Sequence, residues 1–525
     1  MTGGYDSLVI GAGHNGLVAA ALLAQAGRKV LVVEASERVG GCAATEEFAP
    51  GFHVSSAAHL LHLLHPEVER RLELARHGLT LAARDMSTVA LGSEARHLVM
   101  PHALRADDSL EKFSTRDSAR LTDLRDRLMR FAGFVHAFQA TVPPRLAGGG
   151  LADRATTARM AWQLRRLGRD DMREFLRIGL SNVADVLNDE LECDILKGAI
   201  GLDAVLGTGF GPRSPNSLFS LLYRLAGQSG GVPGALSQPR GGMGAVTGAM
   251  AAAARAAGVD IRTEAPVAHI LVENDRAAGV ELASGEVIGA RSVVSGVDPK
   301  TTLLDLLGAA HLDTGFVRRI RAIRAEGMTA KLHLALDGLP EFAGVTRAQL
   351  AGRLVIAPSL DALETAFNPC KYGQTPERPG IEITIPTLSD PGLAPNGKHV
   401  LSAVVQYAPY RLKAGWEASR EAFVDRVVAM ISEHAPELKK LILAREFLAP
   451  PDIEARFGVA GGHWHHAELA PDQLLMMRPV PGAGQYATPM PGLWLCGAGT
   501  HPGGGVMGAA GLNAARRVLA VEGRR

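Results

Sequence analysis

The sequence has few aromatic residues, few cysteines and no excess of charge of either sign. Only 5% of its 525 residues are Phe, Trp or Tyr, so no aromatic cage for a cationic amine is visible. Cys42, Cys193, Cys370 and Cys496 form no C-x-x-C pair, which argues against a redox-active dithiol and favours a reducing compartment. Lys and Arg number 55 against 54 Asp and Glu, so we expect no nucleic-acid partner.

Long apolar runs are absent as well. The longest uncharged stretch, Pro479 to Ala515, is broken by many Gly and Pro residues, so no membrane-spanning helix is expected. The first strand begins within a few residues of Met1, which leaves no room for a signal or transit peptide. We therefore expect a cytoplasmic protein, with peripheral membrane contact by a helix between Leu104 and Arg224 left open. The oligomeric state also stays open.

Glycine, by contrast, is abundant, and its clearest pattern lies near the N-terminus. Gly11, Gly13 and Gly16 form G-x-G-x-x-G between a short apolar run and a predicted helix. A second predicted strand ends at Glu34, which can accept hydrogen bonds from ribose hydroxyls. In this motif the glycines allow a tight turn, close approach of the backbone to a pyrophosphate, and close packing of helix on strand.

The spacing alone carries little weight, because 60 glycines in 525 residues produce it by chance roughly once per chain. A second match, at Gly503, Gly505 and Gly508, is followed by a predicted helix but by no strand that ends in an acid. Only the first match has strand, helix, second strand and acid in order, so it predicts a dinucleotide site.

The remaining pattern predicts a discontinuous α/β protein. Residues 57–64 and most of 104–224 are expected to be helical, and residues 259–295 to return to the nucleotide-binding sheet. A β-rich segment from about Met328 predicts a second sheet, followed by a helix at Arg420–His434. We predict a Rossmann-type domain made of residues 1–100, 225–300 and 485–525. Residues 101–224 and 301–484 would form an α+β substrate domain with a helical insertion.

Several motifs together resemble one family of flavoenzymes. The residues after Glu34 read E-A-x-x-R-x-G-G, and the chain also contains PRGGMG, VVSGVDP, QYAPY and THPGGGVMGAAGLNAA. These motifs resemble the FAD-dependent amine oxidase and phytoene desaturase superfamily, in its carotenoid desaturase-like branch. Within that branch they look most similar to the group called pyridine nucleotide-disulphide oxidoreductase domain-containing protein 2.

The resemblance implies non-covalent FAD bound across the discontinuous domain. Met507-Gly508 would open a helix toward the flavin, where a helix N-terminus stabilises negative charge. Many relatives carry an acid where this chain has Gly497-Ala498-Gly499, so that contact would come from the backbone. The expected FAD-binding residues are Gly11, Ala12, Gly13, Asn15, Gly16, Glu34, Arg38, Gly40, Gly41, Val267, Gly497, Met507 and Gly508.

Two histidines are candidates for acid–base chemistry. His501 lies in the terminal glycine-rich loop, and His466, in GGHWHHAEL, matches a histidine of the resembled group. Each could equally be a hydrogen-bonded loop histidine without a catalytic role.

Other polar residues have plainer interpretations. His59, His62 and His65 would drift around a helix that Pro66 ends, and without nearby acids they predict no metal site. Lys331 could be a buried active-site amine, but a snorkelling surface lysine is the favoured interpretation. Cys42 could suggest covalent flavin attachment, but a packed thiol is favoured.

The sequence therefore predicts an FAD-dependent oxidoreductase acting on a small molecule. It would transfer a hydride between a carbon of an apolar or amphipathic substrate and the flavin, which supplies the difficult chemistry. The alternatives are an amine oxidase that uses oxygen, and a flavoprotein whose main role is to bind or regulate a partner. The direction of reaction and the electron acceptor stay open.

Overall fold

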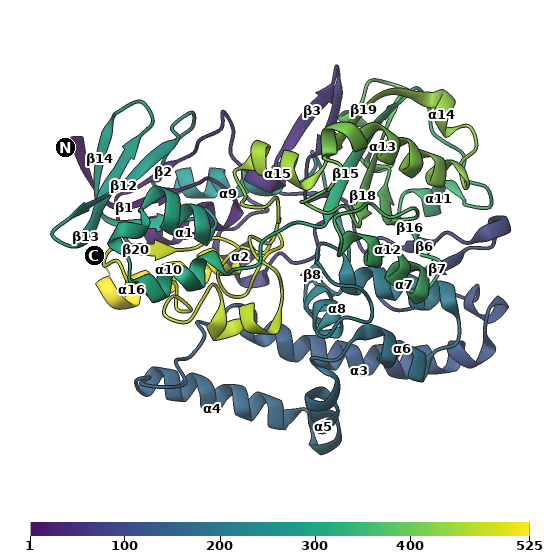
Figure 1. The fold of residues 1–525 in the computed structure, drawn as a ribbon, viewed down its shortest axis with the longest axis horizontal. Coiled ribbons are helices and arrows are strands. Elements are labelled where there is room, and N and C mark those ends of the chain that lie inside the picture. The colour runs from purple at the N-terminus through teal and green to yellow at the C-terminus, as the bar shows by residue number, and fades with distance from the viewer. Residues whose placement is uncertain (1, 524–525) are drawn as a thin grey trace.

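The computed structural model describes residues 2–523 and contains two seven-stranded sheets, one in each half of the molecule (Figure 1). The first sheet has the order β11-β2-β1-β14-β13-β12, and β20 also pairs with β14. Strand β1 runs parallel to β2 and β14, and β20 runs parallel to β14. Its strands are β1 (Thr2–Ile10), β2 (Val30–Val33), β11 (Asp260–Arg262), β12 (Val267–Glu273), β13 (Arg276–Leu282), β14 (Val287–Ser295) and β20 (Leu493–Leu495).

The beginning, middle and end of the chain thus meet in one sheet, and the predicted mixed α/β fold is confirmed. Helix α1 (His14–Gln25) packs against both α9 (Gly244–Ala256) and α16 (Ala509–Glu522) beside it. All three helices are rich in alanine, which lets their backbones approach closely. A Cβ atom on Gly511 of α16 would lie 2.1 Å from the carbonyl oxygen of Asn15 in α1.

This close approach predicts the effect of enlarging Gly511. Gly511→Val should lower the free energy of unfolding by about 3 kcal/mol, because a rigid backbone atom occupies the space that the side chain needs. Urea unfolding of the purified protein measures it. Gly248→Ala in α9 is the matched control, since nothing lies within 4 Å of its Cβ position. That control should be neutral or slightly stabilising, and equal losses in the two variants would contradict the argument.

The second sheet has the order β19-β15-β18-β17-β16-β6-β7. Its core is formed where α13 (Trp416–Ser432) packs its apolar face on the buried strands. The strands are β6 (Thr88–Ala90), β7 (Leu98–Met100), β15 (Thr329–Leu336), β16 (Arg353–Ile356), β17 (Gly380–Thr384), β18 (His399–Gln406) and β19 (Ile442–Leu448). The predicted second sheet and the helix after it are therefore present, and β6 and β7 join this sheet although they precede residue 100.

The predicted helical region lies below the second sheet in Figure 1. It comprises α3 (Thr115–Gln139), α4 (Leu151–Arg166), α5 (Arg169–Ile178), α6 (Val183–Glu190), α7 (Asp194–Val205) and α8 (Ser217–Leu225). The shorter helices elsewhere are α10 (Thr314–Arg321), α11 (Arg347–Leu350), α12 (Leu360–Cys370), α14 (Leu438–Leu441) and α15 (Pro450–Phe457). Within residues 2–523 no helix is both long and apolar enough to cross a bilayer.

One helix expectation is wrong. Residues 57–64 form no helix, and Pro66 begins helix α2 (Pro66–Arg71) rather than ending one. Proline fits the first turn of a helix, where its missing N–H would have no partner anyway. The His65 side chain caps α2 by accepting a hydrogen bond from the backbone N–H of Glu67. The preceding segment instead runs as an extended loop, with His59 and His62 in the wall of a cavity.

Candidate active site

A cavity lies at the carboxyl ends of β1, β2 and β14. In parallel sheets this edge is where dinucleotides bind. Nine of the predicted site residues line it: Gly11, Gly13, Asn15, Gly16, Glu34, Gly40, Gly41, Val267 and His466. The sequence motif at the chain's beginning and a loop near its end therefore face one space.

The glycine turn leaves room for a ligand. Gly11 has φ +91°, and a Cβ on Gly16 would lie 2.1 Å from the Gly11 carbonyl oxygen, so both positions require glycine. Gly13 also lines the cavity, and its Cβ position has no neighbour within 4 Å. The backbone at Gly13 is thus open to a diphosphate.

The Glu34 carboxylate is fixed at the same edge. One oxygen, Oε2, accepts a hydrogen bond from the Ala12 N–H at 2.6 Å. The other, Oε1, accepts from the backbone N–H of Ser36 at 3.0 Å and from its hydroxyl at 2.9 Å. A carboxylate held in this way can accept further hydrogen bonds from ribose hydroxyls.

Buried nitrogens in this cavity also lack partners. Nε2 of His14 and Nδ1 of His466 have no hydrogen-bond partner among the described residues, although both side chains line the cavity. Buried polar groups are usually satisfied, so these atoms fit contacts to a bound group. The open glycine turn, the fixed acid and the unsatisfied nitrogens together fit a flavin dinucleotide.

Some predicted residues lie elsewhere. The Arg38 side chain is 48% exposed and pairs with its neighbour Glu37. Ala12 is buried behind Glu34, and Gly497 packs on the carbonyl of Gly296. Met507 lies in a small apolar cluster, and Gly508 caps α16 against Val68 and Val18. The terminal loop reaches a cavity through the two preceding residues, 505 and 506.

The two candidate histidines lie in different surroundings. His466, with φ +60°, lines the cavity at the glycine turn, and burial lowers the pKa of its side chain to about 3. His501 lines neither large cavity; its Nε2 lies 2.9 Å from the carbonyl oxygen of Phe138. Burial lowers the pKa of His501 to about 4. Only His466 is therefore placed to touch a bound group.

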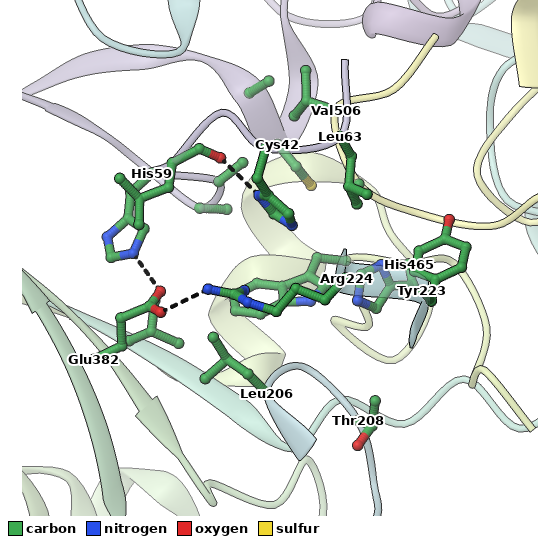
Figure 2. A pocket seen from close by; sticks show the side chains of 18 of the residues that line it. Cys42, His59, Leu63, Leu206, Thr208, Tyr223, Arg224, Glu382, His465 and Val506 are labelled. Carbon is green, nitrogen blue, oxygen red and sulfur yellow. Dashed lines mark hydrogen bonds and ion pairs between the residues drawn. The ribbon is translucent and has the colours of Figure 1, made fainter. Parts of the chain in front are cut away.

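A second cavity adjoins the first (Figure 2). His14, Cys42 and Trp464 line both spaces. The second cavity is mostly apolar, and its apolar lining includes Leu60, Leu63, Leu206, Val404, Leu469 and Val506. A ligand here would lie directly beside a group bound in the first cavity.

Charged side chains gather at one wall of the second cavity. In Figure 2, His59 and Arg224 both point toward Glu382. His59 Nε2 lies 2.8 Å from one Glu382 oxygen, and Arg224 Nη2 lies 3.3 Å from the other. Arg224 Nε also pairs with Asp203 at 3.0 Å. The buried Arg353 forms ion pairs with both acids of this wall, Asp203 and Glu382.

This network keeps Glu382 ionised. Burial opposes ionisation, but the Arg353 charge and the His59 hydrogen bond hold the pKa of Glu382 well below its ordinary value. The Arg224 guanidinium lines this cavity, so its positive charge lies where a polar group of a ligand could meet it.

Lys331 lies beyond this wall, and the expectation of a surface lysine is wrong. Its side chain is fully buried, because β15 is covered on both faces. Its Nζ donates to the Ser402 hydroxyl at 2.9 Å and lies 3.0 Å from His59 Nδ1. Burial lowers the pKa of Lys331 to about 7. With Lys331 as donor, His59 Nδ1 accepts, so its Nε2–H is the atom that faces Glu382.

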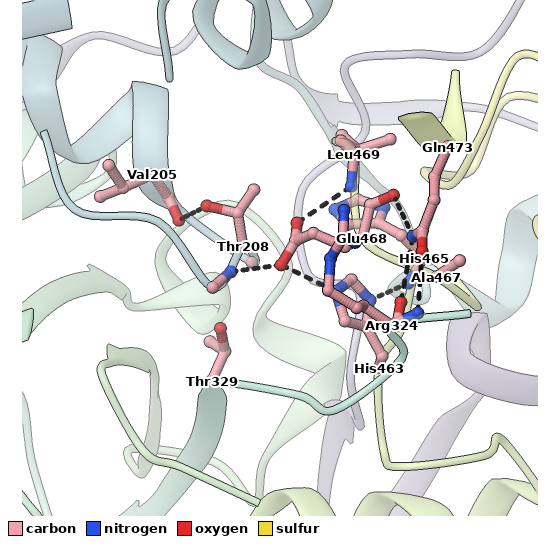
Figure 3. A network of polar contacts seen from close by, with 12 residues as sticks. Val205, Thr208, Arg324, Thr329, His463, His465, Ala467, Glu468, Leu469 and Gln473 are labelled. Carbon is pink, nitrogen blue, oxygen red and sulfur yellow. Dashed lines mark hydrogen bonds and ion pairs between the residues drawn. The ribbon is translucent and has the colours of Figure 1, made fainter. Parts of the chain in front are cut away.

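The loop that carries Trp464, His465 and His466 is held by a polar network (Figure 3). Glu468 accepts hydrogen bonds from the backbone N–H groups of Gly209 at 2.6 Å and Leu469 at 2.9 Å. Arg478, which is fully buried, donates to six backbone carbonyls. Those acceptors belong to two segments, 465–473 and 498–500, so one guanidinium ties the histidine loop to the terminal loop.

No metal site accompanies these residues. Within residues 2–523 no group of three His, Cys, Asp or Glu side chains is arranged to hold a metal ion. All four cysteines are free thiols. Cys42 faces both cavities, and burial raises the pKa of its thiol to about 12.

Comparison with known proteins agrees with this geometry. Residues 16–519 match the family described as flavin containing amine oxidoreductase. "Pyridine nucleotide-disulfide oxidoreductase domain-containing protein 2" of Mus musculus is 36% identical, over 98% of this chain and 93% of its own length. One of the subunits of limonene dehydrogenase from Castellaniella defragrans is 26% identical, over 98% and 94%.

A solved structure shares the fold. An oxidoreductase from Methanosarcina mazei superposes with a TM-score of 0.59 at 18% identity, covering 98% of this chain and 99% of its own. The family match spans nearly the whole chain, and the mouse relative covers both sheets and the helical region. The chain therefore belongs to the flavin containing amine oxidoreductase family and is an FAD-dependent oxidoreductase.

Proposed function

We propose that the protein binds FAD non-covalently and oxidises or reduces a carbon centre of an amphipathic molecule. The observation that carries this proposal is the pair of adjoining cavities that share His14, Cys42 and Trp464. When bound, the flavin supplies hydride acceptance or donation. The Cys42 thiol supports non-covalent binding, because its raised pKa keeps it protonated and a poor nucleophile.

The second cavity indicates what the substrate looks like. Its apolar lining would hold a hydrocarbon body beside the flavin and exclude water from the reacting carbon. At the charged wall, Arg224 would bind a polar end group of the same molecule. The name of one relative, limonene dehydrogenase, indicates a hydrocarbon substrate for that protein and supports the apolar part of the proposal.

The histidines act here as neutral groups. Burial lowers the pKa values of His14 to about 4 and of His62 to about 3, so neither carries charge at neutral pH. They can orient a substrate by hydrogen bonding and can accept a proton only if the bound state raises their pKa. His466 is the proposed histidine contact to the flavin, and His501 is proposed to be structural.

Amine oxidation is the second candidate. It is favoured only by the family description, because the acids at the cavity wall are already paired with arginines. A regulatory flavoprotein is the third. Anaerobic mixing with limonene, a long-chain unsaturated fatty acid and hexylamine separates the three, with flavin absorbance as the readout.

We expect the apolar or amphipathic probes to bleach the flavin and hexylamine to leave it oxidised. Bleaching by hexylamine, followed by peroxide formation when oxygen is then admitted, would favour the amine oxidase, and no bleaching with any probe or metabolite extract would favour the regulatory role.

Removal of Arg224 should affect amphipathic substrates selectively. Arg224→Gln should raise KM for a probe with a polar end by about tenfold or more, because a hydrogen bond to a charged group is lost. The flavin content should stay unchanged. Arg213→Gln, which removes an exposed arginine paired with Asp361, is the control and should leave KM unaltered. An equal change in both variants would contradict the assignment of the charged wall.

The domain division is also a proposal. The expected first boundary at residue 100 is moved in this proposal to before Thr88, because β6 pairs with β16 of the second sheet. Residues 1–87, 225–300 and 485–525 would then form the FAD-binding domain, and the remainder the substrate domain. The four free thiols fit the reducing environment of the cytoplasm.

A further inference from the structure

Helices α4 and α5 stand away from the body of the molecule, at the lower edge of Figure 1. We refer to residues 145–180 as the arm. Helix α4 has no buried residue along its 16-residue length. The arm is anchored through α5, where Ile178 is buried in the core and Phe175 packs on aromatic rings of α3. Polar contacts add to this, including Gln485 Nε2 to Asp153 at 2.7 Å and Arg130 Nε to Asp171 at 2.6 Å. Helix α4 is thus attached to the body but left uncovered.

The apolar stripe of α4 faces solvent. Leu151, Ala155, Ala158 and Trp162 are all exposed, at spacing i, i+4, i+7 and i+11, which places them on one helix face. Leu151 is 83% exposed and Trp162 is 62% exposed. The partly covered face is mixed, with Asp153, Thr156 and Gln163 beside Met160 and Leu164. The exposed stripe is therefore apolar surface in addition to the apolar residues that face the body.

The arm concentrates exposed apolar side chains. Eleven large apolar side chains are exposed in the described part of the chain, and five of them lie in these 36 residues. Besides Leu151 and Trp162, they are Leu146, Leu176 and Leu180. Such a cluster marks an interaction surface rather than scattered surface residues.

The arm is also strongly basic. It contains eight arginines against four acids, a net charge of +4, whereas the whole chain carries +1. Three of the four acids are already bonded, Asp153 to Gln485, Asp171 to Arg130 and Glu174 to Arg177. The exposed arginines of α4, which border its apolar stripe, are Arg154, Arg159, Arg165 and Arg166.

We propose that the arm docks on an anionic phospholipid surface. An interfacial helix of this kind buries its apolar face at the headgroup boundary while its basic residues meet anionic lipid. Tryptophan favours that boundary. The combination of an apolar stripe with bordering arginines fits a bilayer surface better than nucleic acid, which offers no apolar layer for Leu151 and Trp162.

The test is sedimentation of the intact flavoprotein with vesicles of phosphatidylcholine alone or with added phosphatidylglycerol. We expect binding only to the anionic vesicles, weakened by high salt, with a blue shift of Trp162 fluorescence. Arg159→Gln/Arg166→Gln should lower the partition coefficient more than tenfold, because each basic residue near the surface contributes about a fivefold factor. Trp162→Ser should lower it as well.

Matched controls separate docking from general effects. Arg318→Gln/Arg321→Gln removes the same charge from exposed positions on α10, and Tyr372→Ser removes an exposed aromatic ring elsewhere. Both should bind vesicles as the parent does. All variants should keep their flavin content and melting temperature, since the changed side chains are exposed.

Three outcomes would overturn the proposal. The protein could remain in the supernatant with every vesicle composition, or the arm variants could bind as well as the controls. Light scattering could instead show an oligomer that Trp162→Ser converts to a monomer, in which case a second copy of the chain covers the stripe.

Discussion

Arg478→Leu is expected to lower the free energy of unfolding by about 4 kcal/mol or more and to abolish flavin retention. The Arg478 side chain is fully buried, and its three nitrogens donate to six carbonyls of the 465–473 and 498–500 segments. Hydrogen bonds to a charged group contribute about 1.5–3 kcal/mol each, and buried carbonyls left without a donor cost more. Losing several of these hydrogen bonds at once should lower the free energy of unfolding more than most single substitutions do.

The charge of Arg478 is neutralised by these dipoles rather than by a paired carboxylate. Burial lowers the pKa of the guanidinium to about 10, so it stays protonated at neutral pH. Arg478→Lys keeps a charge but has three donor protons for six acceptors, and we expect an intermediate loss. Because the held loops carry His466 and Ala498, which line the flavin cavity, binding should fail along with stability.

The measurement is urea unfolding together with the flavin content of the purified variant. Arg324→Leu is the matched control, because Arg324 contacts the same loop through an exposed pair with Asp472. Surface pairs contribute about 0–1 kcal/mol, so this control should unfold nearly as the parent does. If Arg478→Leu kept both stability and flavin, the guanidinium could not be what holds the two loops.

Acid should unfold the protein between pH 6.5 and about pH 4. Six buried histidines have pKa values lowered from 6.5: to about 4 for His14, His59, His65 and His501, and to about 3 for His62 and His466. Burial is the main cause in each. Below pH 6.5 the unfolded chain binds protons at these side chains, whereas the folded chain does not until about pH 4. Stability therefore falls with falling pH through this range.

The free energy of unfolding should depend steeply on pH in this range. Six protons taken up on unfolding correspond to as much as about 8 kcal/mol per pH unit, which is comparable to the whole stability of a typical protein. Urea unfolding at several pH values, with FAD in excess, measures the slope. His501→Gln keeps a donor for the Phe138 carbonyl and removes one titrating group, so its slope should be smaller by about 1.4 kcal/mol per pH unit. Stability that stays constant from pH 7 to pH 5 would contradict neutral, buried histidines.

The nucleotide-binding part of the fold could be predicted because its residues are close in sequence. The span from Gly11 to Glu34 contains the whole strand–turn–helix–strand unit, and local rules fix each part of it. The terminal strand and helix were predictable for the same reason. Their union with β11 and β14 required only that parallel strands share a sheet, and β12 and β13 extend that sheet in antiparallel pairing.

The charged wall could not be predicted, because its members come from five segments. His59 lies in the loop between β4 and α2, Asp203 and Arg224 lie on α7 and α8, and Arg353 and Glu382 lie on β16 and β17. Their one indication in the sequence is a charged residue within each of two apolar strands. His14, which lines both cavities, is one of the variable positions of the glycine motif, so the motif itself gives it no role.

The errors have physical causes as well. The spacing of His59, His62 and His65 suggested a helix. The backbone N–H of Leu61 instead donates to the carbonyl of the distant Ser237 at 2.8 Å, so it makes no helical hydrogen bond within its own segment. Lys331 alternates with apolar residues along β15, a pattern typical of a strand with one face in solvent. Strand β15 is buried on both faces, so neither face reaches solvent. In each case tertiary contacts override the local pattern.

The central claim is that distant parts of the chain enclose one FAD. The most direct measurement is the amount of flavin per polypeptide in purified protein, before and after denaturation and removal of the precipitate. We predict one FAD per chain, all of it released into the supernatant. Well-folded protein that stays colourless after incubation with excess FAD would contradict the account.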